Sequence, residues 1–352
     1  MKKQTIVIAL SGGVDSAVAA LLLKKQGYNI IAAFMKNFSD TKDPITGECN
    51  WKKEKLEAQK IASHLKIPLI TFDFEKEYKT KVIRPMIQDY KKGLTPNPDV
   101  SCNTIIKFPL FWKKTKALKA DYMATGHYAR TKKTSKGYHL LSGKDKTKDQ
   151  SYFLSELTQK DLEHTLFPVG NLTKLEVRKI AKRNKFPNHD KKSTRGICFV
   201  GKVNLKSFLE KTIKNKPGKV KDHNNNTIGT HPGTSYYTIG QRAAPSSEII
   251  LDKPNKKYYI AEKKGNTLTV APQGHQILKT KTIKIKSLKL INRKQKIQPN
   301  IKARIRHLAP LLSGKLTKDT FKLKKPIEGI APGQQIVLYK NQELIASGQI
   351  TN

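Results

Sequence analysis

The first third of the chain alternates between short apolar segments and helical patterns, and this alternation restricts the fold more than any other feature. The apolar segments are "TIVIAL" from Thr5, "NIIAAFM" from Asn29, "IPLITFDF" from Ile67 and "ADYMATG" from Ala120. The helical patterns cover residues 17–26, 51–65, 78–90 and 104–118. Because right-handed crossovers join strands that alternate with helices, the sequence predicts an α/β fold. Its doubly wound, mostly parallel sheet should extend to about residue 200.

The texture of the sequence changes after Cys198. One short helical stretch follows, and then brief apolar pieces separated by Gly, Asn and Pro, which indicates a small mixed domain. From Lys279 onward, alternating segments recur at hairpin-like spacing and predict a β-barrel of about six strands. We therefore expect three domains, namely residues 1–202, residues 203–274 and residues 275–352, with residues 164–187 able to pack against the middle one.

Positive charge is the strongest compositional signal. The 352 residues contain 69 Lys and Arg but 27 Asp and Glu, and the net charge of +42 favours nucleic acid or another polyanion as a partner. Residues 275–300 contain eight Lys or Arg and no acidic residue, with lysines that alternate with Ile and Leu. Such a strand presents one cationic face to a phosphate backbone. The alternative explanation of the positive charge is a genome biased toward A and T, whose proteins are rich in Lys, Asn and Ile. Both explanations stay open at this point.

Cysteine usage and hydropathy indicate a cellular location. Cys49, Cys102 and Cys198 are too few and too scattered for a disulfide framework, which favours a reducing compartment. No apolar run approaches the roughly 20 residues that a bilayer span needs, and the segment after "MKKQ" lacks the pattern of a secretion signal. We expect a cytoplasmic, monomeric protein without a membrane partner.

The segment "LSGGVDS", from Leu10 to Ser16, joins the first predicted strand to the first predicted helix. Its adjacent glycines let backbone N–H groups approach an anion, and the helix N-terminus favours negative charge. Ser11 and Ser16 add hydroxyl donors. The segment matches neither a Walker loop nor GxGxxG. It predicts a phosphate site, and the alternative is a strand-to-helix turn with a serine cap.

A second candidate site lies in "TPNPDVSCN". Pro96 and Pro98 restrict the backbone, so Asn97, Asp99 and Cys102 are expected on a stiff loop ahead of a helix. A position just before a helix, in basic surroundings, lowers the pKa of a thiol and would make Cys102 a competent thiolate. The alternative is that this cysteine is a small buried apolar residue.

These features together resemble one protein family. "SGGVDS" is similar to the loop of the PP-loop ATP pyrophosphatase superfamily, which binds the pyrophosphate of ATP during adenylation of a carbonyl oxygen. Within that superfamily the chain resembles the tRNA-specific 2-thiouridylase family, which places sulfur on the wobble uridine of certain tRNAs. The matching stretches follow the family's order along nearly the whole chain: "FMKN" at Phe34, "GLTPNPDVSCN" at Gly93, "IKF" at Ile106, "ATGHYAR" at Ala124, "KDQSYFL" at Lys148, "LFPVGNLTKLEVRKIA" at Leu166, "GICFVG" at Gly196, "YTIGQR" at Tyr237 and "PGQ" at Pro332.

The resemblance implies an adenine nucleotide alpha-hydrolase type of fold and an enzyme that uses ATP with Mg²⁺. It implies adenylation of the uracil carbonyl at ring position 2, followed by sulfur delivery from a persulfide on Cys198. Cys102 is then the partner in thiol–disulfide exchange, and Asp99 is a candidate acid or base. The implied partners are tRNA and a cysteine desulfurase or sulfur-relay protein. Cys49 matches no catalytic position.

The same resemblance assigns binding residues. The implied ATP site comprises Ala9, Leu10, Ser11, Gly12, Gly13, Val14, Asp15, Ser16, Met35 and Gly126. The target base is expected against Asn97, Pro98 and Asp99. The implied tRNA contacts are His127, Lys148, Asp149, Gln150, Arg304, Ile305 and Gln334, with Arg306 in the same segment. The alternatives are a buried strand-end histidine at 127, a merely solvated "KDQ" segment, and arginines that simply face outward from a barrel strand.

Two departures from the family pattern stand out. Ser193, Thr194 and Arg195 precede "GICF", where the family has "DST", and "AAPSSE" follows "GQR" where the family has Lys and Gly-rich residues. The first concerns the positioning of Cys198 and the second an RNA contact. Two other functions remain in view: a PP-loop ligase such as lysidine synthetase, which needs no paired cysteines, and a non-catalytic RNA-binding protein, which needs no ATP loop.

Overall fold

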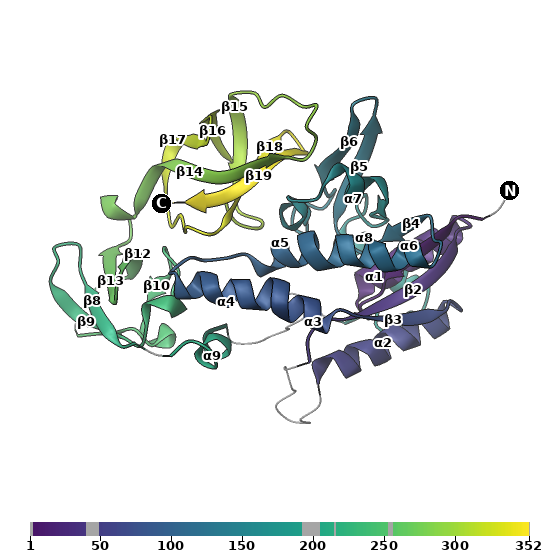
Figure 1. Ribbon diagram of the computed structural model, residues 1–352, viewed down its shortest axis with the longest axis horizontal. Helices are drawn as coiled ribbons and strands as arrows, with labels where there is room; N and C mark the ends of the chain where they lie inside the picture. Colours follow the sequence, from purple (N-terminus) through teal and green to yellow (C-terminus); the bar gives the residue numbers. More distant parts are fainter. Residues whose placement is uncertain (1–2, 40–48, 192–204, 215, 253–255, 352) are drawn as a thin grey trace.

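The computed structural model describes residues 3–39, 49–191, 205–214, 216–252 and 256–351. These residues fold around three β-sheets (Figure 1). In the view of Figure 1 the N-terminal sheet lies at the right, the middle sheet at the lower left and the C-terminal barrel at the upper left. Among the described residues, no helix combines the length and apolar character that a bilayer span requires.

The first sheet is parallel throughout, with the strand order β3-β2-β1-β4-β7. Its strands are β1 (Thr5–Ala9), β2 (Asn29–Lys36), β3 (Leu69–Asp73), β4 (Tyr122–Ala124) and β7 (Thr165–Leu166). The chain moves outward from β1 to β3 and then returns to the other side of β1. The strand order therefore reverses between β1 and β4, where doubly wound sheets bind their ligands. This confirms the predicted fold class.

Helices cover both faces of this sheet because its strands alternate between two apolar clusters. Ile6 and Ile8 of β1 belong to one cluster, and Val7 and Ala9 belong to the other. The first face is covered by α1 (Val14–Lys25), α2 (Asn50–His64) and α8 (Lys174–Arg183). The second is covered by two runs with π-helical middles: α3 (Glu75–Tyr78), η1 (Lys79–Ile83) and α4 (Arg84–Lys91), then α5 (Pro98–Cys102), η2 (Asn103–Leu110) and α6 (Phe111–Ala117).

One prediction about helices is corrected. The helix predicted for residues 104–118 begins at Pro98, because the Asn97 side chain caps it and proline suits its first position. Residues 164–187 were expected to be able to pack against the middle domain. They contribute β7 and α8 to the first unit, which consists of the parallel sheet and the helices that cover it, and Val177 and Ala181 of α8 are buried with α1 there.

The middle sheet is mixed, as the sequence predicted. Its order is β10-β12-β13-β8-β9-β11, in which the β13–β8 pair is parallel and the others are antiparallel. The strands are β8 (Gly218–Lys221), β9 (Thr227–His231), β10 (Arg242–Ala243), β11 (Ile250–Leu251), β12 (Tyr258–Lys264) and β13 (Thr267–Pro272).

The remaining short helices are α7 (Gln159–Glu163), α9 (Leu205–Glu210), and the 3₁₀ turns η3 (Ser151–Leu154), η4 (Thr234–Tyr236), η5 (Pro245–Ser247) and η6 (Gln276–Leu278).

Six antiparallel strands form the C-terminal barrel, and the pairing of β14 with β19 closes it. The strands are β14 (Lys279–Leu290), β15 (Asn300–Arg304), β16 (Leu312–Thr317), β17 (Thr320–Glu328), β18 (Gln335–Lys340) and β19 (Glu343–Thr351). Alternate residues such as Ile283 and Ile285 of β14 fill its interior. The predicted six-stranded barrel is confirmed.

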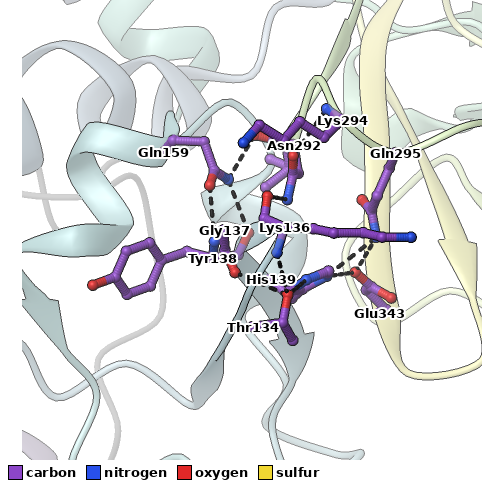
Figure 2. A network of polar contacts seen from close by, with 11 residues as sticks. Thr134, Lys136, Gly137, Tyr138, His139, Gln159, Asn292, Lys294, Gln295 and Glu343 are labelled. Atoms are coloured by element: carbon purple, nitrogen blue, oxygen red, sulfur yellow. Dashed lines mark hydrogen bonds and ion pairs between the residues drawn. The ribbon is translucent and has the colours of Figure 1, made fainter.

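A hairpin from the first unit extends the sheet of this barrel, which the sequence did not predict. Strands β5 (Ala129–Thr134) and β6 (Gly137–Ser142) form the hairpin, and β6 pairs with β19. Figure 2 shows how side chains fix it. The amide of Gln159 donates to the carbonyls of Tyr138 (2.8 Å) and Ile291 (3.0 Å). His139 bonds to Glu343, so the hairpin joins the first unit to the barrel.

Candidate functional site

The glycine loop follows β1 directly and lies at the point where the strand order reverses. Gly12 has φ +74°, and a Cβ there would lie 2.7 Å from the carbonyl oxygen of Glu54 in α2. Glycine is therefore required for both its backbone angle and its close approach to α2. The Gly12 carbonyl accepts from Asn188 Nδ2 at 3.1 Å and from Lys191 Nζ at 3.2 Å. These contacts fix the loop from the opposite side.

Hydroxyl groups shape the interior of the loop. Ser16 Oγ donates to the Gly13 carbonyl at 3.0 Å and accepts from the Ser11 N–H at 3.3 Å. Gly13, with extended backbone, is the N-cap of α1, and no side chain of a described residue caps this helix. The serine-cap alternative is therefore wrong. The loop leads straight into an uncapped helix N-terminus, which favours a phosphate group.

Asp15 in the first turn of α1 ties the loop to two other motifs. Its Oδ1 accepts from the Tyr128 hydroxyl at 2.7 Å and from Lys174 Nζ at 2.6 Å. Burial, reinforced by the Asp15 carboxylate, raises the pKa of Tyr128 above its usual value of 10, so its hydroxyl stays a donor. Tyr128 comes from "ATGHYAR" and Lys174 from the start of α8. Neither contact of Asp15, with Tyr128 or with Lys174, was predicted from the sequence.

Gly126 packs against the same loop. A Cβ at this position would lie 2.7 Å from the backbone nitrogen of Ser16 and 3.0 Å from its Cα. We predicted that glycine here lets a nucleotide approach the backbone. The structure gives it another reason, because any side chain would push the first turn of α1 out of place.

Met35 and Asn37 lie at the end of β2, on the same edge of the sheet. Met35, expected to pack on adenine, is 6% exposed and belongs to the same apolar cluster as Cys102. Asn37 is 1% exposed, and no described residue bonds to its amide nitrogen or oxygen. A buried amide without partners is costly, which makes Asn37 a candidate ligand contact. Its place in "FMKN" is the sequence signal that could have identified it.

The helix that starts at Pro98 carries the residues predicted for the target base. Asn97 caps it, with Oδ1 accepting from the Val100 N–H at 3.2 Å, and Asp99 lies in the first turn. Cys102 was expected on a loop ahead of the helix. It lies inside the helix instead and is 0% exposed, within the apolar cluster of the second sheet face. The low thiol pKa expected for Cys102 stays a prediction.

The other two cysteines differ in what the structure says of them. Cys198 and the departure at Ser193–Arg195 lie outside the described residues. Cys49 donates its thiol to the Ser39 carbonyl at 3.2 Å. Cys49 is a free thiol. The implied pairing of Cys102 with Cys198 therefore stays a proposal.

His127 matches the alternative of a buried strand-end histidine. It is 9% exposed, Thr125 Oγ1 lies 2.8 Å from its Nδ1, and its ring packs 5.9 Å from that of Phe108. Burial, with a smaller contribution from Lys107, lowers its pKa well below 6.5. The ring is therefore neutral at neutral pH, and an RNA contact from it stays a prediction.

The "KDQ" segment and the barrel arginines meet one another. Asp149 is 1% exposed, and its Oδ2 pairs with Arg304 Nη1 at 3.0 Å. Gln150 Oε1 accepts from the Tyr128 N–H at 2.9 Å. The Asp149 carboxylate is engaged inside the protein, and the RNA contact predicted for this residue stays a prediction. Asp149 joins the segment to the barrel, and Gln150 joins it to Tyr128.

The remaining predicted RNA contacts differ in exposure. Ile305 is 7% exposed and packs inside the barrel, so only its backbone is available to a partner. Lys148 and Gln334 are half-buried, and Arg306 is exposed. Surface positions of this kind suit the phosphate contacts that fix an RNA on a protein.

Magnesium has no preformed cage in the part of the chain that the structure describes. Within it, no group of three or more His, Cys, Asp or Glu side chains is placed to hold a metal ion. Asp15, the acidic residue of the segment from Leu10 to Ser16, already pairs with Lys174. These residues fit a magnesium ion that arrives with ATP and takes most of its ligands from phosphate and water.

Family models match the chain in three successive parts. The descriptions are "tRNA methyl transferase HUP domain" for residues 4–202, "tRNA methyl transferase PRC-barrel domain" for residues 206–272 and "Aminomethyltransferase beta-barrel domain" for residues 280–350. Curated relatives match it end to end. tRNA-specific 2-thiouridylase MnmA 1 of Geobacillus kaustophilus is 40% identical over 99% of this chain and 96% of its own length. tRNA-specific 2-thiouridylase MnmA of Nitrosomonas eutropha is 38% identical over 100% of this chain and 99% of its own.

The glycine loop, the helix that Asn97 caps and the barrel all lie within the aligned region, because the whole chain aligns with these relatives. The match covers every domain and leaves no large segment of either chain unaligned. The chain belongs to the tRNA-specific 2-thiouridylase family.

Proposed function

We propose that this chain is a tRNA 2-thiouridine synthase, an ATP-dependent sulfurtransferase that acts on the wobble uridine. The observation that carries the proposal is the phosphate loop, in which Gly12 is packed against α2 and leads into the uncapped N-terminus of α1. This geometry supports cleavage of ATP by departure of an anion. Membership of the 2-thiouridylase family selects sulfur transfer to tRNA among the reactions that adenylate a carbonyl.

The loop acts in the first step. The oxygen on ring position 2 of the uridine attacks the α-phosphorus of ATP, a new O–P bond forms, and pyrophosphate leaves. Backbone N–H groups at Gly13 and the first turn of α1 stabilise the charge that develops on pyrophosphate. Lys174 and Tyr128 hold Asp15, which keeps this turn in place. Magnesium, bound with ATP, would offset the remaining phosphate charge.

The uridine has to leave the stack of the anticodon loop to reach the phosphate. Asn97 caps the helix, Pro98 and Asp99 lie in its first turn, and the three residues would hold the base. The Asp99 carboxyl group accepts or donates the proton that the uracil ring exchanges as its carbonyl is activated. Asn97 keeps the turn in shape by capping it at Val100.

Two cysteines complete the reaction. The terminal sulfur of a Cys198 persulfide attacks the activated carbon, and AMP leaves. The Cys102 thiolate then attacks Sγ of Cys198 and breaks the S–S bond, so the transferred sulfur stays on the ring and the two cysteines become a disulfide. A thiol reductant restores both thiols, and a cysteine desulfurase or sulfur-relay protein recharges Cys198. Because Cys102 is fully buried, this exchange is shielded from competing thiols in solution.

Reconstitution tests the proposal. The protein is incubated with ATP, Mg²⁺, a persulfide source and unmodified tRNA, and the nucleosides are analysed by mass spectrometry. We expect 2-thiouridine, and AMP in the same amount. If folded protein produces neither, the proposed function is wrong.

Cysteine variants separate this enzyme from a PP-loop ligase. Cys102→Ser and Cys198→Ser should each abolish 2-thiouridine formation while ATP binding persists. The matched control is Cys49→Ser, because that thiol contacts the Ser39 carbonyl and has no role in the reaction. If Cys102→Ser and Cys198→Ser both kept full catalytic activity on tRNA, a PP-loop ligase would be favoured.

A further inference from the structure

An open cleft lies where the β5–β6 hairpin, α7 and the end of β14 meet. Its volume is about 710 Å³, and the described residues that line it are Lys136, Gly137, residues 155–160 and residues 288–294. None of them is among the single residues that the sequence assigned to ATP, the target base or tRNA. A space of this size holds several groups of a ligand, because one water molecule takes up only about 30 Å³.

Positive charge dominates the lining of this cleft. Five exposed cations contribute to it, namely Lys136, Lys160, Lys289, Arg293 and Lys294. No carboxylate of a described residue forms an ion pair with any of the five. Among the described lining residues Glu156 is acidic, and its Oε1 accepts from Gln335 Nε2 at 2.6 Å. The cleft therefore favours an anionic ligand.

Amide side chains fix the backbone segments that carry these cations (Figure 2). Asn292 is 2% exposed, and its Nδ2 donates to the Lys136 carbonyl at 2.9 Å while its Oδ1 accepts from the Lys294 N–H at 3.0 Å. Gln159, the neighbour of Lys160, donates to the Ile291 carbonyl at 3.0 Å. The three segments are thus bonded to one another. Less conformational freedom is lost on binding when the segments are already held in place.

The cationic face of β14 leads into the cleft. Lys281, Lys284 and Lys286 are exposed along this strand, and Lys289 continues the row to the cleft lining. At about 3.3 Å per residue, the row from Lys281 to Lys289 is about 26 Å long. A row of this length suits a polyanion whose charges repeat along a backbone, as in RNA, better than a single small anion.

The cleft is remote from the glycine loop. Tyr128, which bonds to Asp15 in the first turn of α1, directly precedes β5, and Lys136 follows that strand in the hairpin turn. At about 3.3 Å per residue, β5 carries the chain roughly 20 Å from Tyr128 to its far end. A phosphate group in the cleft would therefore belong to a part of the RNA well away from the target nucleotide.

We propose that this cleft binds the sugar–phosphate backbone of tRNA at a distance from the target uridine. The inference rests on the proposed function and adds to it a second, separate point of contact with the substrate. Contacts with phosphates fix the position and orientation of a nucleic acid without reading its sequence. The cleft thus contributes to tRNA affinity, and its residues touch none of the reacting atoms.

A triple variant with Lys136→Gln, Lys160→Gln and Lys294→Gln tests the proposal, because it removes one cation from each of the three segments. We expect the Kd for tRNA to rise about fivefold or more, and the slope of log Kd against log salt to fall by about 2. At saturating tRNA, kcat should stay within about twofold of the wild type. The matched control replaces Lys113, Lys114 and Lys116 with Gln, which removes three exposed cations from α6 outside the cleft.

The control variant should keep the wild-type Kd and slope. Equal slopes in the two triple variants would overturn the inference, and so would an unchanged Kd for tRNA in the cleft variant. If the cleft variant kept its tRNA affinity but lost only sulfur delivery from a cysteine desulfurase or relay protein, the cleft would bind an acidic protein and the proposal would be wrong. Failure of the proposed function differs from these results, because the wild type would then form no 2-thiouridine, whereas tRNA binding is measured without turnover.

Discussion

Asp149 and Arg304 are 155 residues apart in sequence and form a buried ion pair, with 3.0 Å between Oδ2 and Nη1. The other oxygen of Asp149 accepts from the backbone N–H groups of Gly143 and Ser151, each at 3.1 Å. The guanidinium carbon of Arg304 lies 5.3 Å from the ring centroid of Tyr339. Two residues that the sequence assigned separately to RNA are thus a joint between the first unit and the barrel.

Removing one charge of this pair should destabilise the protein. Asp149→Asn keeps the size of the side chain but leaves the Arg304 cation buried without its partner. We expect the free energy of unfolding to fall by about 3 kcal/mol or more, measured by urea denaturation. Asp319→Asn, on an exposed turn, is the control and should change it by less than about 0.5 kcal/mol. Equal midpoints for the two variants would contradict a stabilising pair.

The parallel sheet was predictable because each of its determinants is local. The residues of β1 alternate between two buried clusters, so both faces read as apolar, and the glycine loop marks the end of that strand. The barrel was predictable for the same reason, since alternating residues such as those of β14 need no knowledge of their partners. Local pattern was therefore enough to predict the fold class, and it also placed the glycine loop at the end of β1.

Features that depend on residues far apart in the sequence could not be predicted. The β5–β6 hairpin pairs with β19, and its His139 bonds to Glu343, which is 204 residues away. Nothing near the hairpin indicates that partner. Cys102 was misplaced for a different reason, because Asn97 and Pro98 were taken as loop residues although together they form a helix cap and first position.

Gly126→Ala tests the packing of the segment just after β4 against the first turn of α1. The added Cβ would lie 2.7 Å from the Ser16 nitrogen, so the first turn of α1 has to move. We expect the Kd for ATP to rise about tenfold or more while the circular dichroism spectrum stays native, because loss of one or two phosphate contacts has that effect. Gly265→Ala is the control, since a Cβ there meets open space, although its φ of +56° makes it slightly strained. Normal ATP affinity in Gly126→Ala would show that the loop tolerates the shift.

Three histidines should make stability depend on pH, namely the buried His127 and His231 and the half-buried His307, because burial lowers the pKa of each ring. Burial, which outweighs the attraction of Asp149, lowers the pKa of His307 to about 4, and burial lowers the pKa of His127 well below 6.5. Between pH 6.5 and 4 the unfolded chain binds protons that the folded chain does not. Stability is therefore full above pH 6.5 and falls as the pH is lowered toward 4.

Urea midpoints at pH 7, 6 and 5 measure this loss. His307→Gln should flatten the decrease between pH 6.5 and 5, because it removes one of the protonating groups from the unfolded chain. His223→Gln, on an exposed turn, is the control and should leave the slope as in the wild type. Identical slopes in the two variants would show that His307 does not carry the effect.

The salt dependence of tRNA binding shows whether the positive charge of the barrel serves RNA binding or only reflects a bias in amino-acid composition. In β14, Lys281, Lys284 and Lys286 are exposed, whereas Ile283 and Ile285 are buried, so the predicted cationic strand face is present. Each phosphate contact contributes about 0.7 to 0.9 to the slope of log Kd for tRNA against log salt. If these lysines engage the backbone, replacing all three with Gln should lower the slope by about 2, as measured by filter binding at several salt concentrations.

A second triple variant, with its three lysines in the first unit, separates the local effect in β14 from the loss of total positive charge. Lys52, Lys53 and Lys66 are exposed in and just after α2, and their replacement with Gln removes the same three charges. We expect that variant to keep the wild-type slope, because only cations that displace counterions from phosphates enter the salt dependence. Equal slopes for both triple variants would mean that the excess of lysine in β14 reflects composition. A lower slope for the β14 variant alone would place the RNA backbone along that strand.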